Sequence, residues 1–457
     1  MNTTSPNENA PLTRPASNGM ERTYIRDLNT KVGERVLIQG WVSVRRDQGK
    51  MVFFDFRDMT GTVQGVVLPN EAEAIEKAKE TRSEFVVAVE GMVNKRPEKN
   101  VQAGKLNGDI ELEVKSISVL SEAVDLPFEV GTEVNLDTHL DYLPYTLRTE
   151  RSKDIFKLQS TIVEAFRQSM KRQNFTEFQS PLLVGGDAEG GAAAFKVDYY
   201  YDQKAFLATS PQFYKQIMAG VFERAFTVAK IFRGEKHATA RHLSEATCMD
   251  FEMCFVKDHT EPMAVLEQSI RDIVSSVAEA HADIFPKFNT TLPLVPTEPF
   301  PSLTLREAQA ILGAPEEPDL EPEQERAICE WAKEEKGSDF VFITAFPTSK
   351  RAFYTYEEPS EAPLSRGFDL LFRGLEINSG AQRIHNYEAL VKKMLDRNLE
   401  PEKFSFYLQA FKYGIPPHGG SSTGLERITA RMLELPNVKE ATLFPRDINR
   451  IDKRLSE

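Results

Sequence analysis

The sequence has few cysteines, no long apolar run and no excess of positive charge. Its 457 residues include only Cys248, Cys254 and Cys329, with no Cys-x-x-Cys or Cys/His cluster, so we expect neither a disulfide framework nor a zinc site. No stretch approaches the roughly 18 apolar residues of a membrane-spanning helix, which predicts no membrane insertion. The formal charge of −13 disfavours a protein that coats nucleic acid through bulk positive charge.

Length and composition indicate a multidomain globular protein. Hydrophobic residues make up 41% and charged residues 27%, and the length predicts two to four domains. Residues 1–19 are rich in Asn, Thr and Pro and lack a basic and apolar leader, so we expect a disordered tail without a secretory signal. Scarce cysteine fits a reducing compartment, which predicts a cytoplasmic location.

Residues 20–122 alternate apolar and polar side chains in five short runs, which predict strands over 35–44, 51–56, 62–68, 85–93 and 110–120. Between the third and fourth runs, 70–81 has no Gly or Pro and begins with Asn70 as a helix N-cap. Five strands with a helix after the third are typical of the OB-fold, a Greek-key barrel that binds oligonucleotides. Other small β domains would give a similar pattern.

A second, larger domain follows a predicted hinge. Residues 123–148 carry prolines and acids without sustained periodicity, which predicts the hinge. From Arg151 a helical period begins, and 149–457 then mixes strands with helices, including one over 262–281 that we expect Thr260 to cap. This predicts an α+β fold of catalytic size. The segment 286–349, rich in Pro and Glu, is where we expect an insertion.

Three segments carry residues suited to phosphate and metal chemistry. Residues 232–245 place Arg233, Glu235, Arg241 and His242 at a turn, although a solvated loop would look the same. Residues 372–385 predict an extended strand with Glu376, Asn378 and Gly380 on one face, where Glu376 and a nearby hydroxyl suit Mg²⁺. A half-buried strand with one satisfied Glu is the alternative.

The third segment, 414–427, is a Gly-rich turn followed by an amphipathic helix over 425–433 with Arg427 near its start. Glycines allow close approach of a ligand, and a helix start with an added Arg attracts anions, although most Gly-rich loops are only turns. A fourth segment, 208–216, places Lys215 after a turn as either a solvated lysine or a carboxylate anchor.

The order of these segments resembles the three signature motifs of the class II aminoacyl-tRNA synthetases. From about Met20 onward the chain is similar to the aspartyl, asparaginyl and lysyl branch, and within it to the archaeal type of aspartyl-tRNA synthetases. The matching segments are Ser210-Pro-Gln-Phe-Tyr-Lys215, Glu189-Gly-Gly191, Arg241-His-Leu243, Gly374-Leu-Glu-Ile-Asn-Ser-Gly380, Pro416-Pro-His-Gly-Gly420 and Leu443-Phe-Pro-Arg-Asp447.

The resemblance implies a ligase that joins L-aspartate to tRNA(Asp) through an ATP-derived adenylate. It implies that Arg233, Glu235 and Arg427 are catalytic and that Glu376 and Ser379 hold Mg²⁺. The implied ATP-binding residues are Arg233, Glu235, Arg241, His242, Leu243, Glu376, Gly424, Leu425, Glu426 and Arg427. The implied aspartate-binding residues are Glu189, Gln212, Lys215, Arg233, Ser379 and Arg383. A long first helix closing on Pro181 resembles the dimer seam of the family, so we expect a homodimer.

Charge favours aspartate over asparagine. An anionic side chain must be paired when it is desolvated, and Lys215 and Arg383 offer two cations. Relatives specific for asparagine typically carry no lysine at the position of Lys215. Glu189 matches the lid residue that meets the substrate ammonium in the family, and we expect Gln212 to join it.

In the barrel, Phe53 and Gln64 lie where relatives stack on and read the central anticodon base, an arrangement suited to single-stranded RNA. Phe53 could instead be a core residue. Arg45, Arg46 and Arg57 are either RNA-backbone contacts or generic surface arginines.

Relatives that accept only tRNA(Asp) tend to carry a Trp where Ser43 stands and a Lys near Asn100. Their absence predicts a non-discriminating enzyme that also charges tRNA(Asn) and feeds an amidotransferase route.

Other interpretations stay open at this point. The enzyme could be strictly specific for tRNA(Asp). The third motif of the family usually has glycine at Ser422 and an apolar residue at Thr423, which leaves room for a weakened ATP site or a catalytically dead tRNA-binding paralogue. A relative that makes asparagine from aspartate and ammonia is disfavoured, because such proteins generally lack the barrel.

Overall fold

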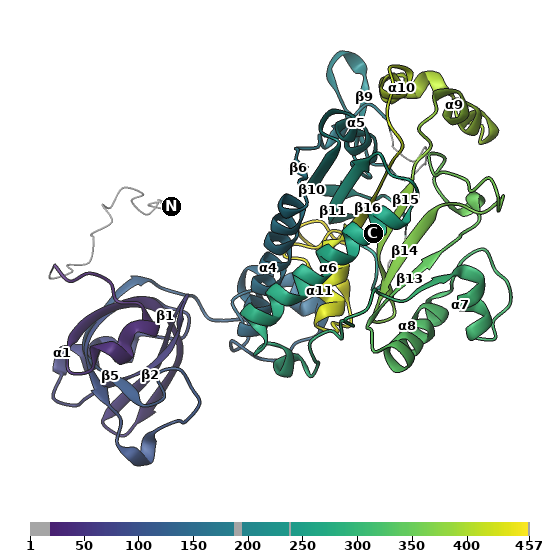
Figure 1. Cartoon of the computed structure of the whole chain (residues 1–457). Helices are drawn as coiled ribbons and strands as arrows, with labels where there is room; N and C mark the ends of the chain where they lie inside the picture. The colour runs from purple at the N-terminus through teal and green to yellow at the C-terminus, as the bar shows by residue number, and fades with distance from the viewer. Residues whose placement is uncertain (1–18, 187–193, 237–238, 456–457) are drawn as a thin grey trace. The chain divides into compact units, whose positions relative to one another are not determined.

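The computed structural model describes residues 19–186, 194–236 and 239–455 (Figure 1). The chain divides into two compact units, Met1–Thr132 and Glu133–Glu457, each with its own hydrophobic core. The predicted tail lies outside the described residues except for Gly19. In the described part, no helix is long and apolar enough to cross a membrane.

The first unit is a closed five-stranded barrel in the order β1-β2-β3-β5-β4, with only β3 and β5 running parallel. This confirms the five predicted strands and the helix after the third. The elements are β1 (Arg35–Gln48), β2 (Met51–Asp58), β3 (Gly61–Val67), α1 (Ala72–Glu80), β4 (Val86–Lys95) and β5 (Ile110–Ser121). The predicted Asn70 cap is wrong, because Glu71 occupies the N-cap position.

Alternation along β2 fills the barrel interior. Phe54 and Phe56 are fully buried and stack with ring centroids 5.2 Å apart, whereas Phe53 between them is only partly buried. This resolves the choice left open for Phe53, which lies on the outer face. Gly65 on β3 passes so close to Phe56 that a Cβ atom would lie 2.4 Å from its ring, so a side chain there would disturb the packing.

The second unit is built on an eight-stranded, mainly antiparallel sheet in the order β12-β13-β14-β15-β16-β11-β10-β6, which confirms the α+β prediction. Its strands are β6 (Thr176–Glu177), β10 (Arg224–Phe232), β11 (Glu245–Cys254), β12 (Ser302–Thr304), β13 (Phe340–Thr344), β14 (Gly367–Phe372), β15 (Leu375–Gln382) and β16 (His418–Gly424). A smaller sheet contains β7 (Leu183–Val184), β8 (Lys196–Asp198) and β9 (Lys204–Leu207).

Three helices cover one face of the large sheet: α4 (Glu150–Arg172), α6 (Thr260–His281) and α11 (Leu425–Met432) (Figure 1). Their apolar stripes and alternate sheet residues, such as Met249, Phe251 and Met253, form the main core. Intervening residues of the same strands therefore point to the opposite face, where the site described below lies. The other α-helices in the described part of this unit are α2 (Leu136–Asp141), α3 (Leu143–Thr146), α5 (Gln212–Phe222), α7 (Leu305–Ile311), α8 (Pro322–Lys336), α9 (Tyr387–Asp396) and α10 (Ser405–Lys412).

Some local predictions differ from the structure. Two short helices, α2 and α3, lie within the predicted hinge. The N-cap of α6 is His259, without a side-chain bond, rather than Thr260. The segment 286–349 contributes β12, α7, α8 and β13 at one edge of the large sheet, and its being an insertion stays a prediction.

Candidate active site

A cavity of about 570 Å³ lies on the sheet face opposite the three covering helices, with residues of β10, β11, β15 and β16 in its wall. This volume is within the range of small-molecule sites, about 300–1,000 Å³. Among the residues that the structure describes, five basic side chains line the cavity against one acidic side chain, Glu376; the basic residues are Arg233, Lys350, Arg351, Arg383 and Arg397. The cavity wall is therefore basic and suits an anionic ligand, although the whole chain is acidic.

Strand register brings polar residues into one row across this face. Asp369 on β14 pairs with Ser379 on β15, Ser379 pairs with Ser422 on β16, and Ser422 pairs with Asp250 on β11. A β-bulge at Ile377 interrupts the alternation of β15, since Leu371 pairs with Glu376 but Leu370 pairs with Asn378.

The bulge decides which residues of β15 reach the cavity. Glu376 and Ser379 both line the cavity. In a regular strand, two residues three positions apart would point to opposite faces of the sheet. Asn378 instead donates to Ser421 and Thr423 on the covered side, at 3.0 and 2.7 Å. The prediction that Glu376 and Asn378 share a face is therefore wrong, because strict alternation ignores the extra residue.

Behind the cavity wall lies a buried cluster of four charges. Lys215 Nζ is 2.8 Å from Asp250 Oδ2 and donates to the Ser421 carbonyl at 3.1 Å. Arg383 donates to both carboxylate oxygens of Glu252, at 3.0 and 3.3 Å. Lys215 Nζ also lies 3.7 Å from Glu252 Oε2, which joins the two pairs. Arg383 lines the cavity and Lys215, 1% exposed, does not, so the two predicted cations lie at different depths.

A second group of charges surrounds Glu376. Arg427 Nη1 lies 3.8 Å from the Glu376 carboxylate and donates to its carbonyl at 3.0 Å. Arg351 binds Asp369 through two hydrogen bonds, at 2.8 and 2.6 Å, and donates to Ser379 at 3.1 Å. Removal from bulk water, followed by the nearby Asp369 carboxylate, raises the pKa of Glu376 to about 7. A cation near Glu376 would stabilise its ionised form.

The predicted residues of 232–245 take different positions. Arg233 lines the cavity, and its peptide N–H donates to the Ser244 carbonyl at 2.9 Å. Glu235 is exposed. Arg241 donates to Glu325 at 2.9 Å, and Glu325 lines a smaller adjoining pocket. His242 is exposed and Leu243 is half-buried, and neither of these predicted residues lines the cavity.

The turn from β16 to α11 brings one of its predicted residues to the site. Gly424 is the N-cap of α11, and Leu425 is buried. Both carboxylate oxygens of Glu426 accept from the Thr247 peptide N–H, at 3.0 and 2.9 Å, so this buried side chain ties α11 to β11. Burial raises the pKa of Glu426. Arg427 alone of these four contacts Glu376.

Two further aspartate-binding predictions were Gln212 and Glu189. Gln212 lines the cavity at the start of α5, and its amide nitrogen is buried without a hydrogen-bond partner in the described part of the chain. An unpaired buried donor is available to a ligand. Glu189 lies outside the described residues, so its role stays a prediction.

The donors for the predicted Mg²⁺ are brought together. Glu376 and Ser379 line both the cavity and the adjoining pocket, and Asp369 lies beside them. A carboxylate and a hydroxyl suit a cation that takes most of its ligands from phosphate and water. No group of three or more His, Cys, Asp or Glu residues in the described ranges is arranged to hold a metal by protein ligands alone.

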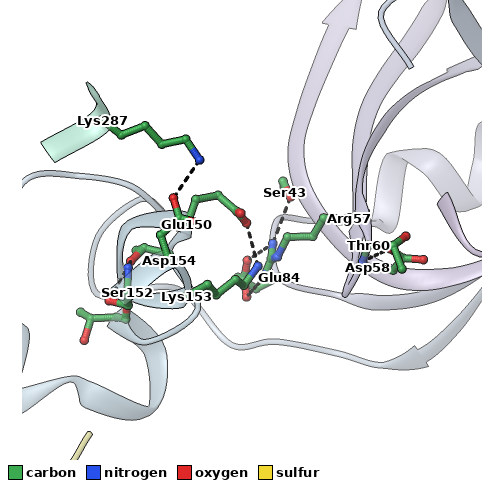
Figure 2. A network of polar contacts seen from close by, with 12 residues as sticks. Ser43, Arg57, Asp58, Thr60, Glu84, Glu150, Ser152, Lys153, Asp154 and Lys287 are labelled. Carbon is green, nitrogen blue, oxygen red and sulfur yellow. Dashed lines mark hydrogen bonds and ion pairs between the residues drawn. The ribbon is translucent and has the colours of Figure 1, made fainter. Parts of the chain in front are cut away.

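In the barrel, Gln64 lines a groove of about 260 Å³ together with Ser43 and Arg46, whereas Phe53 is not among the groove residues. Figure 2 shows Arg57 between Glu84 and Ser43, to which it donates at 2.8 and 3.1 Å. Arg57 is only 6% exposed, so neither predicted surface role fits it.

Arg45 and Arg46, the other two arginines considered for RNA contacts, also have protein partners. Arg46 pairs with Asp55 at 2.9 Å, and Arg45 donates to the Ala78 carbonyl at 3.0 Å.

Sequence reasoning missed three basic residues of the cavity wall, Lys350, Arg351 and Arg397, and also Asp369. Asp369 had a recognisable signal, because it is a lone charge in the apolar strand Gly367–Phe372 and a buried charge needs a partner. Arg351 lies in a segment without periodicity, between β13 and β14, and gave no comparable signal.

Comparisons with known proteins agree with this geometry. Residues 135–448 match the family described as class II tRNA synthetases (D, K and N), and residues 36–120 match the OB-fold nucleic acid binding domain. The aspartate--tRNA(Asp/Asn) ligase of Thermus thermophilus is 42% identical, over 94% of this chain and 99% of the relative. The aspartate--tRNA(Asp) ligase of Thermococcus kodakarensis is 37% identical, over 92% and 96%.

A solved relative extends the comparison to structure. The asparaginyl-tRNA synthetase of Pyrococcus horikoshii, complexed with asparaginyl-adenylate, has a TM-score of 0.85 and 30% identity, and the match covers 94% of this chain and 99% of that one. Sequence, fold and the basic cavity therefore lead to one conclusion: this chain belongs to the class II tRNA synthetases of the aspartyl, lysyl and asparaginyl group.

Proposed function

We propose that the protein is an aspartate--tRNA ligase. A carboxylate oxygen of L-aspartate attacks the α-phosphorus of ATP, and pyrophosphate leaves with the electron pair of the broken bond. The terminal-adenosine hydroxyl of tRNA then attacks the acyl carbon, loses its proton to a phosphate oxygen and releases AMP. The observation that carries the proposal is the cavity, whose described wall has five basic side chains and one acid, which matches polyanionic ATP and the carboxylates of L-aspartate.

Catalysis in this scheme is positioning and neutralisation of charge. Arg233 in the cavity wall meets the α-phosphate and the attacking carboxylate, and Arg427 meets the far phosphates. Glu235 contacts the adenine, and Arg241, His242 and Leu243 flank the phosphate end. Glu376 and Ser379 would hold Mg²⁺, with Asp369 as a neighbouring oxygen donor, and the bound ion would neutralise phosphate charge.

Aspartate is favoured over asparagine by the buried cations. Arg383 reaches the cavity with Lys215 behind it, and both are already held in place by carboxylates. Prepositioned cations favour an anionic side chain over a neutral amide. Gln212, with its unpaired buried nitrogen, and Glu189 complete the amino-acid site.

A second proposal concerns the tRNA. The Thermus thermophilus relative is named for both tRNA(Asp) and tRNA(Asn), and the Thermococcus kodakarensis relative for tRNA(Asp) alone. Ser43 in the barrel groove supports dual charging, which would require an amidotransferase partner. Aspartylation of transcripts that differ only in anticodon tests this. We expect both to be charged, and charging of tRNA(Asp) alone would establish the strictly specific enzyme.

We also propose a homodimer in the cytoplasm. Helix α4 has an open, largely apolar groove that includes Leu147, Phe156 and Leu443. Sedimentation of the full chain should give twice the mass of one chain, and Phe156→Glu should shift it toward the monomer. A monomer at micromolar concentration without this substitution would contradict the proposal.

A further inference from the structure

Ser422 occupies a central place in the row of polar residues across the sheet. It lies on β16 between Asp250 of β11 and Ser379 of β15, and its side chain lines the cavity. The Ser422 hydroxyl donates to Asp250 Oδ1 at 2.6 Å, and Asp250 is fully buried. A group that contacts the substrate cavity thus holds a carboxylate that the solvent does not reach.

The other oxygen of Asp250 connects Ser422 to the amino-acid cations. Asp250 Oδ2 binds Lys215, which lies 3.7 Å from Glu252, and Glu252 binds Arg383. Ser422 and the four buried charges therefore form one continuous network of contacts. It begins at the cavity wall with Ser422 and returns to that wall with Arg383. Loss of the hydrogen bond at one end therefore alters how strongly the charges in this network interact.

The neighbours of Ser422 serve a different purpose. Ser421 and Thr423 point to the helix-covered face, where Asn378 donates to both hydroxyl oxygens. Thr423 is 2% exposed and does not line the cavity. Only the middle residue of this triplet therefore has its hydroxyl on the substrate side, and Thr423 offers a matched control.

We propose that Ser422 is a positioning residue for the amino-acid substrate, and this inference rests on the proposed aspartate ligase function. By binding one oxygen of Asp250, the hydroxyl fixes the carboxylate and shares its negative charge, so that Lys215 and Arg383 keep their attraction for an anionic side chain. Without the hydroxyl, the charge of Asp250 falls on Lys215 alone. The affinity for aspartate then decreases, whereas the affinity for ATP does not.

The test is aspartate-dependent ATP–pyrophosphate exchange by the full chain carrying Ser422→Ala, Ser422→Gly, Ser422→Thr or Thr423→Val. A hydrogen bond to a charged group corresponds to about tenfold in affinity or more. We expect Ser422→Ala and Ser422→Gly to raise KM for aspartate about tenfold, with KM for ATP changed less than about twofold. Ser422→Thr keeps the hydroxyl and should restore KM for aspartate, and Thr423→Val should leave both constants unchanged.

These measurements distinguish the role of Ser422 from the proposed ligase function. Equal increases in both KM values, or an unchanged KM for aspartate in both hydroxyl-free variants, would overturn the role of Ser422 but not the proposed function. Failure of Ser422→Thr to restore KM for aspartate would also overturn it, because the hydroxyl is then not the cause. No exchange by the unsubstituted protein would contradict the proposed function and this inference together.

Discussion

At the residue scale, the site depends on cations that are already paired. Lys215 and Arg383 each bind a buried carboxylate, so the four charges balance without substrate. Removing one member of a buried pair is more costly than the pair itself is stabilising, because the remaining charge stays desolvated. The cluster that we propose to select the amino acid is therefore sensitive to substitution.

Lys215→Met should lower the free energy of unfolding by about 3–5 kcal/mol, because it leaves Asp250 as an unpaired buried charge. Urea denaturation of the full chain measures this. The matched control is Lys392→Met, which breaks an exposed pair with Asp396 on α9 and should cost less than about 1 kcal/mol. Adding Asp250→Asn to Lys215→Met should recover part of the loss; equal effects of the two lysine substitutions would contradict the account.

Glu376 predicts a dependence of stability on pH. Its pKa rises from 4.5 to about 7 on folding, so the folded state binds more protons than the unfolded state between these values. The free energy of unfolding therefore falls as pH increases through this window. The side chain is 37% exposed, and solvent reduces the size of the effect.

Glu376→Gln removes this ionisation. The melting temperature of the variant should increasingly exceed that of the unsubstituted protein from pH 4.5 to pH 8, while exchange activity falls. Thermal unfolding without ligands measures the difference, with exposed Glu402→Gln as the control. A difference that is the same at both pH values would show that Glu376 ionises normally.

At the element scale, the two faces of strand β2 have different predicted roles, one in folding and one in RNA binding. Phe54 points into the barrel core and Phe53 to the outside, one residue apart. Phe54→Ala should lower the free energy of unfolding by about 3–5 kcal/mol. Phe53→Ala should have a small effect on stability and raise KM for tRNA, with exchange in the absence of tRNA unchanged. Unaltered tRNA charging by Phe53→Ala would remove Phe53 from the anticodon site.

Elements were predictable from periodicity, but their registers were not. The barrel strands, α4 and α11 follow from the spacing of apolar residues, since each spacing produces one buried face. The bulge at Ile377 depends on how β14 pairs with β15, which local sequence does not specify. Arg351 lies in a segment without periodicity and reaches the cavity only through the tertiary fold, so local sequence did not indicate it.

At the scale of the whole molecule, net charge describes binding poorly. The chain carries −13, and residues 20–123 hold 16 Lys and Arg against 17 Asp and Glu, so the acidity lies mainly outside the barrel. The cavity nevertheless has five basic lining residues and one acidic one. An acidic surface with a local basic site disfavours nonspecific polyanions while retaining the specific ones.

For the whole molecule, we propose that this cavity activates aspartate with ATP. The most direct measurement is ATP–pyrophosphate exchange by the purified full chain with aspartate or asparagine, with and without tRNA. We predict exchange with aspartate, and a kcat/KM roughly 100-fold lower with asparagine, because a neutral amide gains no charge attraction from the prepositioned cations. No exchange with aspartate under either condition, or equal exchange with asparagine, would contradict the account.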